Sequence, residues 1–226
     1  MRAIIIVPAF NEAKILYSVL KNLPSKINGL SKIETLVVND GSTDETIEQA
    51  KKAKVKVVNH LINRGLGAAI KTGLDFAKAH NYDILITFDG DGQHNPHDIN
   101  EIVKPIIKKE ADLVIGSRFK KNQNAPLDRL IINWLANTAT LIFFGVFTSD
   151  SQSGLRAFSK KAILLINYKA DRMDFSSELL LEAKRNKLVI KEVPTTLIYT
   201  EYSRKKGQKN INSINIFAKF LVRLFR

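Results

Sequence analysis

Two aspartates separated by a single glycine, Asp89 and Asp91, follow directly after an apolar run that ends at Phe88. Such a run predicts a buried strand, and open α/β sheets place their ligands at the carboxyl ends of their strands. Two carboxylates this close repel each other unless a cation lies between them, and Mg²⁺ and Mn²⁺ prefer carboxylate oxygens as ligands. The small Gly90 would let a diphosphate approach, and Gln93 could add an oxygen or a water contact. The segment therefore predicts a Mg²⁺ or Mn²⁺ site for a phosphorylated ligand, with an acidic turn as the alternative.

Acidic residues also follow two earlier apolar runs. Asp40 begins the turn 40–44 after the second run and could accept hydrogen bonds from a nucleobase or a ribose. Glu12 follows the first run and is placed to serve the same nucleoside. The competing interpretation is structural: residues 42–44 would form a turn and cap the next helix, and Glu12 would lie at a helix N-terminus. We expect the capping interpretation to hold for at least part of residues 42–44.

A glycine-rich segment, residues 63–69, resembles a dinucleotide-binding fingerprint. It does not follow the first strand, and its third glycine is replaced, so we do not expect a dinucleotide cofactor here. Gly65 and Gly67 are instead interpreted as allowing close approach at the N-terminus of a helix. The four histidines are interpreted as bystanders, although His94 adjoins the two aspartates.

Strand-like and helix-like patterns alternate along the first half of the chain. Runs that are apolar on both faces, separated by helical patterns, predict a parallel sheet covered on each side. The expected fold class is therefore α/β, with a Rossmann-like, mostly parallel sheet and helices on both faces, in one domain over residues 1–200. The predicted strands are 3–7, 35–39, 55–58, 84–88, 113–115 and 155–158, with strand material over 189–199 broken at Pro194. The predicted helices are 11–23, one from about 44, 65–80, 96–108, 127–147, 175–185 and 211–225.

The chain has 226 residues, with 35 Lys or Arg against 22 Asp or Glu and no cysteine. This length suits one α/β domain, and the lack of cysteine excludes disulfides and thiolate chemistry. The first residues read as a buried strand rather than a signal peptide, so a cytoplasmic location is expected. In the tail, residues 201–226, a helical pattern places apolar residues on one face and basic residues on another. A basic amphipathic helix is typical of membrane-surface binding, with a helix packed on the domain as an equal alternative.

Residues 130–147 form a second apolar segment, near the lower length for a membrane-spanning helix. Asn133, Asn137 and Thr140 recur at spacings of four and three, which places them on one stripe of that helix. A polar stripe on an apolar helix favours an interface or groove-lining helix over a membrane span.

Several of these segments occur together in one known family. Val7–Glu12, Asp40–Asp44 and Asp89–His94 resemble the motifs of the family 2 glycosyltransferases, which have the fold called GT-A. Gly116–Arg118 and Asp150–Phe158 make the chain similar to the branch that contains the dolichyl- and polyprenyl-phosphate mannose and glucose synthases. The resemblance covers nearly the whole chain.

The resemblance implies a role for each motif residue. A sugar nucleotide, GDP-mannose or a UDP-hexose, would contact Pro8, Phe10, Glu12, Asp40, Asp89 and Asp91. The divalent metal would be surrounded by Asp89, Asp91 and Gln93. Arg118 and Arg204 would meet the phosphates of donor or acceptor, because guanidinium groups bind phosphates through paired donors. The family often has Ser-Lys after the Gly-Gln pair of the tail, whereas this chain has Lys209-Asn210, so its lysine is displaced by one position.

The implied reaction is the transfer of a hexose, with inversion in a single displacement, to a polyprenyl or dolichyl phosphate. The metal would neutralise the negative charge that develops on the leaving diphosphate. An anionic acceptor needs positioning by Arg118, Arg129 or Arg204 rather than a strong base. If the acceptor were instead a hydroxyl of a growing glycan, Asp150 would be the candidate base, with a hydrogen-bonding role in its loop as the structural alternative.

Two non-catalytic alternatives remain. A lipid-phosphate-binding protein would not need the aspartate pair, and a nucleic-acid-binding protein would bind with steep salt dependence. The chain has no aromatic stacking motif for nucleic acid, so we expect no nucleic-acid partner. A lipid-linked acceptor requires contact with a bilayer, and we therefore predict peripheral attachment to the cytoplasmic face of a membrane through the tail and the 130–147 helix.

Overall fold

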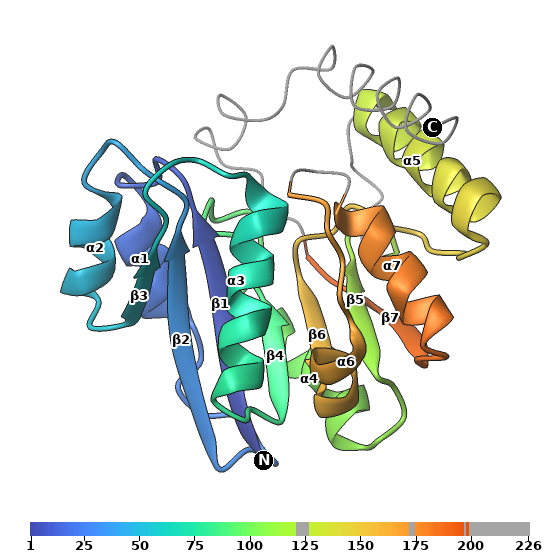
Figure 1. Ribbon diagram of the computed structural model, residues 1–226, viewed down its shortest axis with the longest axis horizontal. Coiled ribbons are helices and arrows are strands. Elements are labelled where there is room, and N and C mark those ends of the chain that lie inside the picture. Colours follow the sequence, from blue (N-terminus) through green and yellow to red (C-terminus); the bar gives the residue numbers. More distant parts are fainter. Residues whose placement is uncertain (121–126, 172–174, 197, 199–226) are drawn as a thin grey trace.

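The computed structural model describes residues 1–120, 127–171, 175–196 and 198 of the chain. Strands and helices alternate along it, as Figure 1 shows. The strands are β1 (Arg2–Ala9), β2 (Lys32–Asn39), β3 (Lys56–Asn59), β4 (Ile84–Thr87), β5 (Leu113–Ser117), β6 (Arg156–Ser159) and β7 (Ile190–Pro194). The helices are α1 (Leu16–Asn22), α2 (Thr46–Lys52), α3 (Leu66–Ala79), α4 (Asp98–Ile107), α5 (Leu127–Phe144), α6 (Lys160–Leu165) and α7 (Phe175–Arg185).

The strands form one sheet in the order β3-β2-β1-β4-β6-β5-β7. Every neighbouring pair is parallel except the two that involve β6, which runs antiparallel to both β4 and β5. Parallel strands end at the same edge of a sheet, so the segments after β1, β2, β4 and β5 meet there. The segment before β6 reaches the same edge because β6 runs in the opposite direction.

Helices cover both faces of the sheet, as the apolar strands require. On β1, Ile4 and Ile6 pack into a core with α3, α6 and α7, whereas Ile5 and Val7 pack into a second core with α1 and α4. All four side chains are fully buried. Figure 1 shows α3, α6 and α7 on the near face of the sheet. A strand that is buried on both faces explains why β1 is a continuous β-branched run rather than an alternating one.

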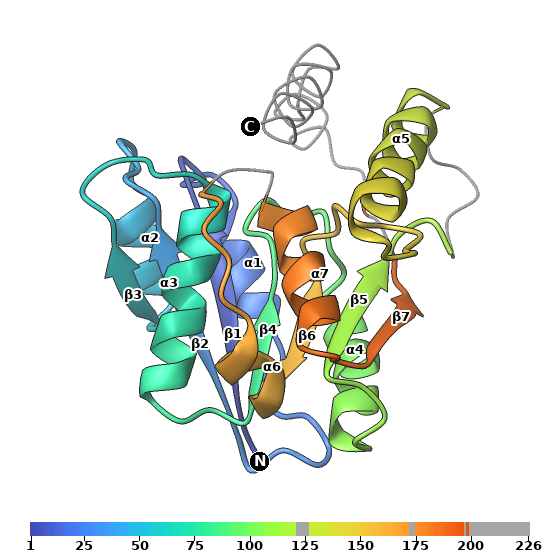
Figure 2. The same cartoon turned by 45° about the vertical axis from the view of Figure 1, so that its right-hand side comes forward.

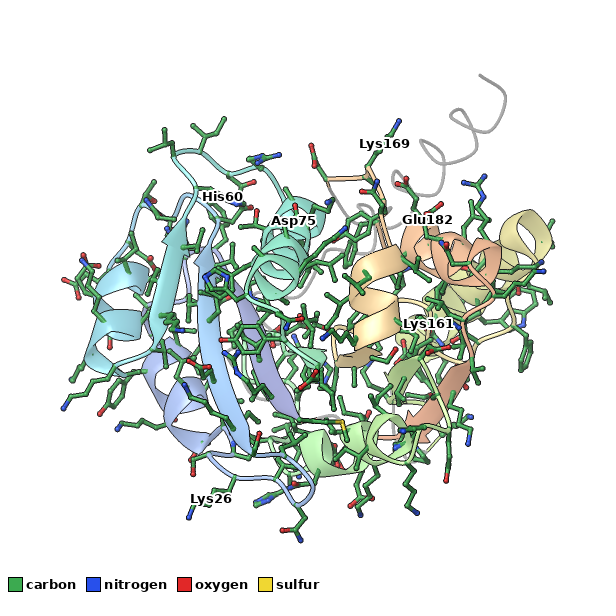
Figure 3. All side chains as sticks on the ribbon, turned by 60° about the horizontal axis from the view of Figure 1, so that its bottom comes forward. Lys26, His60, Asp75, Lys161, Lys169 and Glu182 are labelled. Carbon is green, nitrogen blue, oxygen red and sulfur yellow. The ribbon has the colours of Figure 1, made fainter. Side chains whose placement is uncertain are left out.

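Helix α5 lies beyond the carboxyl ends of the strands, above the tip of β5 in Figure 2. The helix predicted over residues 127–147 is therefore confirmed, although it ends at Phe144. Among the residues that the structure describes, no helix is both long and apolar enough to cross a bilayer. The excess of positive charge is carried in part by exposed lysines, among them Lys26, Lys161 and Lys169, which are labelled in Figure 3.

The predicted fold class is confirmed, with differences of detail. The strand over 155–158 was predicted without its antiparallel direction, and α6 was not predicted. Helix α1 begins at Leu16 rather than at residue 11, because Asn11 has a positive φ of 55° and residues 13–15 form a turn. The predicted C-terminal helix, residues 211–225, lies outside the described residues.

Candidate active site

The carboxylate of Asp89 rests against strand β6, just beyond the end of β4. The antiparallel register places Thr87 opposite Arg156, and the same register continued by two residues sets Asp89 across from Gly154. A Cβ atom on Gly154 would lie only 1.9 Å from Asp89 Oδ2, so the carboxylate touches the glycine backbone directly. His94, which is 2% exposed, donates a hydrogen bond from Nε2 to the same oxygen at 3.2 Å. Asp89 is thus held from two sides.

The two aspartates of the motif differ in acidity. Burial opposes ionisation of Asp89, but the hydrogen bond and charge of His94, together with two nearby arginines, hold its pKa below the usual value. Burial, followed by the charge of Asp89, raises the pKa of Asp91 to about 6. Gln93 partly offsets this by donating its backbone N–H to Asp91 Oδ1 at 3.0 Å and its side-chain Nε2 to Oδ2 at 2.7 Å. The pair carries a repulsion that a divalent cation would relieve.

The donor set fits a divalent cation that is shared with a diphosphate. Asp89 and Asp91 supply hard carboxylate oxygens, which Mg²⁺ and Mn²⁺ bind together with phosphate and water oxygens. No group of three or more acidic or histidine side chains in the described part of the chain is arranged to hold a metal by itself. A cation at this position would therefore be bound by the two protein carboxylates, and oxygens of a bound diphosphate would fill its remaining coordination positions. The ligand role of Gln93 stays a prediction, since its amide nitrogen faces Asp91.

Asp40 anchors the loop between β3 and α3. Its side chain is almost fully buried and accepts hydrogen bonds from the backbone N–H groups of Arg64 at 3.0 Å and Gly65 at 2.7 Å. His60 donates from Nδ1 to the same carboxylate at 2.8 Å, and its Nε2 accepts from the hydroxyl of Thr72 at 2.9 Å. The acid therefore shapes the loop that begins at the carboxyl end of β3 (Figure 3 labels His60). Its predicted contact with a nucleoside stays a prediction.

Two of the four histidines contact acids of the site. His60 binds Asp40, and His94 binds Asp89. The interpretation of all four histidines as bystanders is therefore wrong for these two. The spacing of His94, five residues after Asp89, was visible in the sequence. The contact of His60 with Asp40 depends on the pairing of β2 with β3 and could not be read from the chain.

The turns after β1 and β2 are joined to each other by side chains. Ser42 Oγ accepts the N–H of Asn11 at 2.9 Å, and Asp44 accepts the N–H of Ala13 at 3.1 Å. Asp44 also accepts the N–H of Thr46, the first residue of α2, at 3.1 Å. The predicted turn role of residues 42–44 is thus confirmed, and Asp44 contacts the start of α2, although the N-cap residue itself is Glu45 and makes no side-chain capping bond. These contacts fix the segment that carries Phe10 and Glu12.

The first strand delivers three of the predicted donor-binding residues to this edge. Pro8 and Glu12 are buried, whereas Phe10 is 41% exposed. Gly90 lies close to Pro8, because a Cβ on the glycine would be 3.1 Å from the Pro8 carbonyl oxygen. The segments after β1 and β4 therefore meet closely, as the sequence predicted.

Arg118 and Asp150 form a buried ion pair next to the aspartate motif. Arg118 Nε donates to Asp150 Oδ2 at 2.7 Å, and one terminal nitrogen, Nη2, donates to Oδ1 at 2.7 Å. The backbone N–H of Arg118 donates to Oδ2 as well, at 3.1 Å. Asp150 is fully buried. The pair joins the end of β5 to the segment before β6, and the arginine charge contributes to the lowered pKa of Asp89.

The polar stripe of α5 faces the protein and holds this segment. Asn133 and Asn137 both donate to the carbonyl oxygen of Ser149, at 2.8 and 2.7 Å. Asn137 also accepts the N–H of Ser151 at 2.9 Å, so it brackets Asp150 from both sides. Glu192 of β7 accepts the N–H and the hydroxyl of Ser149 at 2.6 and 2.8 Å. The stripe, which predicted an interface or groove-lining helix, therefore packs against the protein through its asparagines, and contact of α5 with a membrane interface stays a prediction.

Arg156 is a buried cation within the Asp150–Phe158 motif, and the sequence predicts no role for it. It is 1% exposed, and its terminal nitrogen donates to the carbonyl oxygen of Ser151 at 2.7 Å. Its guanidinium lies over the ring of Phe175 at 5.5 Å from the centroid. Burial lowers the pKa of Arg156 to about 10, although the charges of Asp150 and Asp89 oppose that shift. It lines a small pocket together with Asp89 and Gly154. Only the antiparallel pairing of β6 could have placed it there.

The structure brings most of the predicted site residues to one edge of the sheet. Arg129 lies in α5, beyond the same edge, and Arg204 lies outside the described residues. The N–H of Ile198 donates to the carbonyl oxygen of Gln93 at 2.8 Å, so the chain passes beside the aspartate motif six residues before Arg204. The predicted residues that meet at this edge are Pro8, Phe10, Glu12, Asp40, Asp89, Gly90, Asp91, Gln93, Arg118 and Asp150.

A mostly parallel α/β sheet with an aspartate pair beyond the carboxyl end of β4 is the arrangement that the sequence predicted for a glycosyltransferase, and the comparison with known families agrees. Residues 4–165 match the model of glycosyl transferase family 2, and the chain belongs to that family. It is 38% identical over 240 residues to a UDP-N-acetylglucosamine–dolichyl-phosphate N-acetylglucosaminyltransferase of Methanococcus voltae, covering 96% of this chain and 94% of that one. It is 30% identical to a polyprenol monophosphomannose synthase of Mycolicibacterium smegmatis, covering 95% and 83%.

A solved structure shows the same fold. Glucosyl-3-phosphoglycerate synthase from Mycobacterium tuberculosis, in complex with Mn²⁺, uridine diphosphate and phosphoglyceric acid, aligns with a TM-score of 0.71. The alignment covers 98% of this chain and 78% of that one at 19% identity. The GT-A fold expected from the sequence is thus confirmed, and the chain is a glycosyltransferase of the dolichyl- and polyprenyl-phosphate branch.

Proposed function

We propose that this chain transfers a hexose, or a related sugar, from a nucleotide diphosphate donor to a polyprenyl or dolichyl phosphate, with inversion and with the help of Mg²⁺ or Mn²⁺. The observation that carries the proposal is the position of a fixed guanidinium, Arg118, next to the carboxylates Asp89 and Asp91. The guanidinium suits an anionic acceptor, and the two carboxylates suit a diphosphate that is bound to a cation. The two similar relatives are named for lipid-phosphate acceptors, which supports the same acceptor class here.

Each part of the site has a separate task in this reaction. Asp89 and Asp91 would hold the cation, which supplies positive charge to the leaving diphosphate. Pro8, Phe10, Glu12 and Asp40 would bind the nucleoside along the ends of β1 and β2. Arg118, kept in place by Asp150, would orient the acceptor phosphate toward the sugar. An acceptor phosphate that is already anionic needs no base to remove a proton. The main contribution of the protein to the reaction rate would therefore be to position the acceptor phosphate against the sugar.

A hydroxyl acceptor is less well supported by the geometry. In that reaction Asp150 would act as the base, yet it is fully buried and both of its oxygens accept hydrogen bonds from Arg118. A carboxylate in that position is poorly placed to reach an acceptor hydroxyl. The hydrogen-bonding role of Asp150 fits these contacts better.

Attachment to a membrane surface is part of the proposal. The outer face of α5 is apolar: Ile131, Trp134, Leu135, Leu141 and Ile142 are 43–69% exposed. Phe147, just after the helix, is 81% exposed. With its asparagines turned inward and its apolar side chains turned outward, α5 has the character of a helix that lies in a bilayer interface. This face lies beyond the same edge of the sheet as the reactive groups, where a lipid-linked acceptor would arrive.

The direct test is a transfer assay on the full chain. GDP-mannose, UDP-glucose and UDP-N-acetylglucosamine would each be offered with a polyprenyl phosphate in mixed micelles, with Mn²⁺, with Mg²⁺ and with a chelator. Metal-dependent formation of a lipid-linked sugar from one donor is the expected result. Transfer to glycan hydroxyls but not to lipid phosphate would contradict the proposed acceptor. Transfer at the same rate with the chelator present would contradict the proposed role of the cation.

A further inference from the structure

We infer that Gly154 is a positioning residue for the metal site, because the missing side chain at this position sets where the carboxylate of Asp89 rests. The inference rests on the proposed metal-dependent function and deepens it. Gly154 would not touch substrate and would act only through Asp89. The sequence gives no hint of this, since the two residues are 65 positions apart.

The space at Gly154 is filled by one carboxylate. The three nearest atoms that a Cβ would meet are Oδ2, Cγ and Oδ1 of Asp89, at 1.9, 2.3 and 2.4 Å. Real Cβ contacts essentially never fall below 3.0 Å, so any side chain at residue 154 would force these atoms apart. The backbone does not itself demand a glycine here, because Gly154 is not among the glycines with positive φ. The glycine is needed for space and not for conformation.

Hydrogen bonds hold the main chain at Gly154 in place, so it cannot move away from Asp89. Thr87, which is 3% exposed, donates from Oγ1 to the carbonyl oxygen of Gly154 at 2.7 Å. On the other side, the hydroxyl of Ser153 donates to the carbonyl oxygen of Gly116 at 2.6 Å. The segment is therefore bound to both β4 and β5. A new Cβ at residue 154 would have to be accommodated by movement of Asp89.

Movement of Asp89 would also break its second restraint. His94 Nε2 approaches Oδ2, the same oxygen that lies nearest to Gly154. Displacement of Oδ2 therefore removes the contact that fixes the carboxylate from the opposite side. Loss of a group that orients a metal ligand in this way typically lowers metal affinity by about 10- to 100-fold.

The test measures binding of Mn²⁺ alone to the full chain, by the loss of the free-ion electron paramagnetic resonance signal. Gly154→Ala is expected to weaken Mn²⁺ binding about 10- to 100-fold while the metal-free protein keeps its circular dichroism spectrum. Thr87→Val preserves side-chain volume but removes the hydrogen bond to Gly154, and a smaller weakening is expected. Ser159→Ala is the matched control, since Ser159 lies at the other end of β6 and caps α6. It should leave Mn²⁺ binding unchanged.

The outcomes separate this inference from the proposed function. If the unsubstituted chain binds Mn²⁺, Asp89→Asn does not, and Gly154→Ala binds as tightly as the unsubstituted chain, the inference is overturned and the metal role stands. If the unsubstituted chain and Asp89→Asn bind equally weakly, the metal role fails and the inference fails with it. Should Gly154→Ala not fold, Thr87→Val decides: unchanged Mn²⁺ affinity in that variant overturns the inference.

Discussion

Asp150 holds Arg118 by two parallel hydrogen bonds of 2.7 Å, from Nε to Oδ2 and from Nη2 to Oδ1. The aspartate is fully buried, whereas the arginine side chain keeps 20% of its surface exposed. The aspartate is therefore fixed inside the protein, whereas part of the arginine side chain reaches the surface. This fork-to-fork geometry depends on the shape of both groups and not on their charges alone.

Arg118→Lys should lower kcat/KM for the acceptor phosphate about 10- to 100-fold, since lost charge-assisted hydrogen bonds are each worth about 1.5–3 kcal/mol. Lysine retains the charge but cannot reproduce the two parallel contacts with Asp150. Initial rates at varied acceptor concentration measure the effect. Lys191→Ala, which breaks an exposed ion pair with Glu110, is the control and should leave kcat/KM unchanged. Equal kcat/KM in Arg118→Lys would contradict a positioning role for the fork.

Asp150→Asn should lower the free energy of unfolding by about 2–3 kcal/mol, because the partly buried guanidinium loses its counter-charge. Urea denaturation at neutral pH measures this change. Glu110→Gln removes an exposed ion pair and serves as the comparison, with no measurable change expected. An unfolding curve of Asp150→Asn that overlays the original would show that the pair contributes nothing to the fold.

Asp89→Asn and Asp91→Asn should each abolish the rise in melting temperature that Mn²⁺ produces, because a ligand stabilises a protein only in proportion to its binding. Sugar transfer should fall at least about 100-fold in both, the order expected when a transition-state charge loses its stabiliser. Asp75→Asn is the matched control, since that side chain is 60% exposed and pairs with Lys71 on the surface of α3. Transfer at the original rate in Asp91→Asn would remove that residue from the metal site.

The pH dependence follows from the pKa of Asp91, which burial and the charge of Asp89 raise from 3.8 to about 6. The folded state therefore binds this proton more tightly than the unfolded state does. Its contribution to stability is fully present below pH about 4 and is lost as pH rises through about 6. A bound cation favours the ionised carboxylate of Asp91 and so offsets the cost of ionising it in the folded protein. The rise in melting temperature that Mn²⁺ produces should therefore grow between pH 5 and 7. In Asp91→Asn the metal-free protein should lose this part of its pH dependence.

Trp134→Ser and Ile142→Glu should reduce binding to vesicles that contain anionic lipid, because both side chains belong to the exposed face of α5. Stability should change little, since exposed positions rarely shift it by more than about 0.5 kcal/mol. Co-sedimentation with the vesicles measures the binding. Leu164→Ser is the control: Leu164 is 47% exposed in α6, at the end of the molecule away from α5 (Figure 1). Equal sedimentation of all three variants would contradict the proposed membrane face.

The sequence was most informative where the structure is local. The apolar run of β1 predicted a buried parallel strand. Because Asp40, Asp89 and Asp91 each follow such a strand, the sequence correctly predicted that they lie at one edge of the sheet. This worked because parallel strands end at a shared edge regardless of which strands are neighbours. The polar stripe of α5 was equally readable, since helical spacing alone puts Asn133 and Asn137 on one face.

The contacts that depend on strand order could not be read from the chain. The sequence of a strand as short as β6 (Arg156–Ser159) does not indicate its direction, and only its antiparallel pairing with β4 brings Arg156 opposite Thr87. The same holds for His60 and Asp40, which meet because β2 and β3 are paired. Helix α6 was missed because six residues are too few for a helical period to stand out.

The antiparallel course of β6 also restricts how the chain can change length. Side chains alternate between the two faces of a strand, so a slip of one residue turns every side chain to the other face. One residue added or deleted between Asp150 and Arg156 would bring Ser153 or Leu155 against the Asp89 carboxylate and turn the buried arginine out of its core. Natural variation and protein engineering should therefore tolerate insertions at the exposed residues Ser25 and Lys26, after α1, and reject them in this short segment.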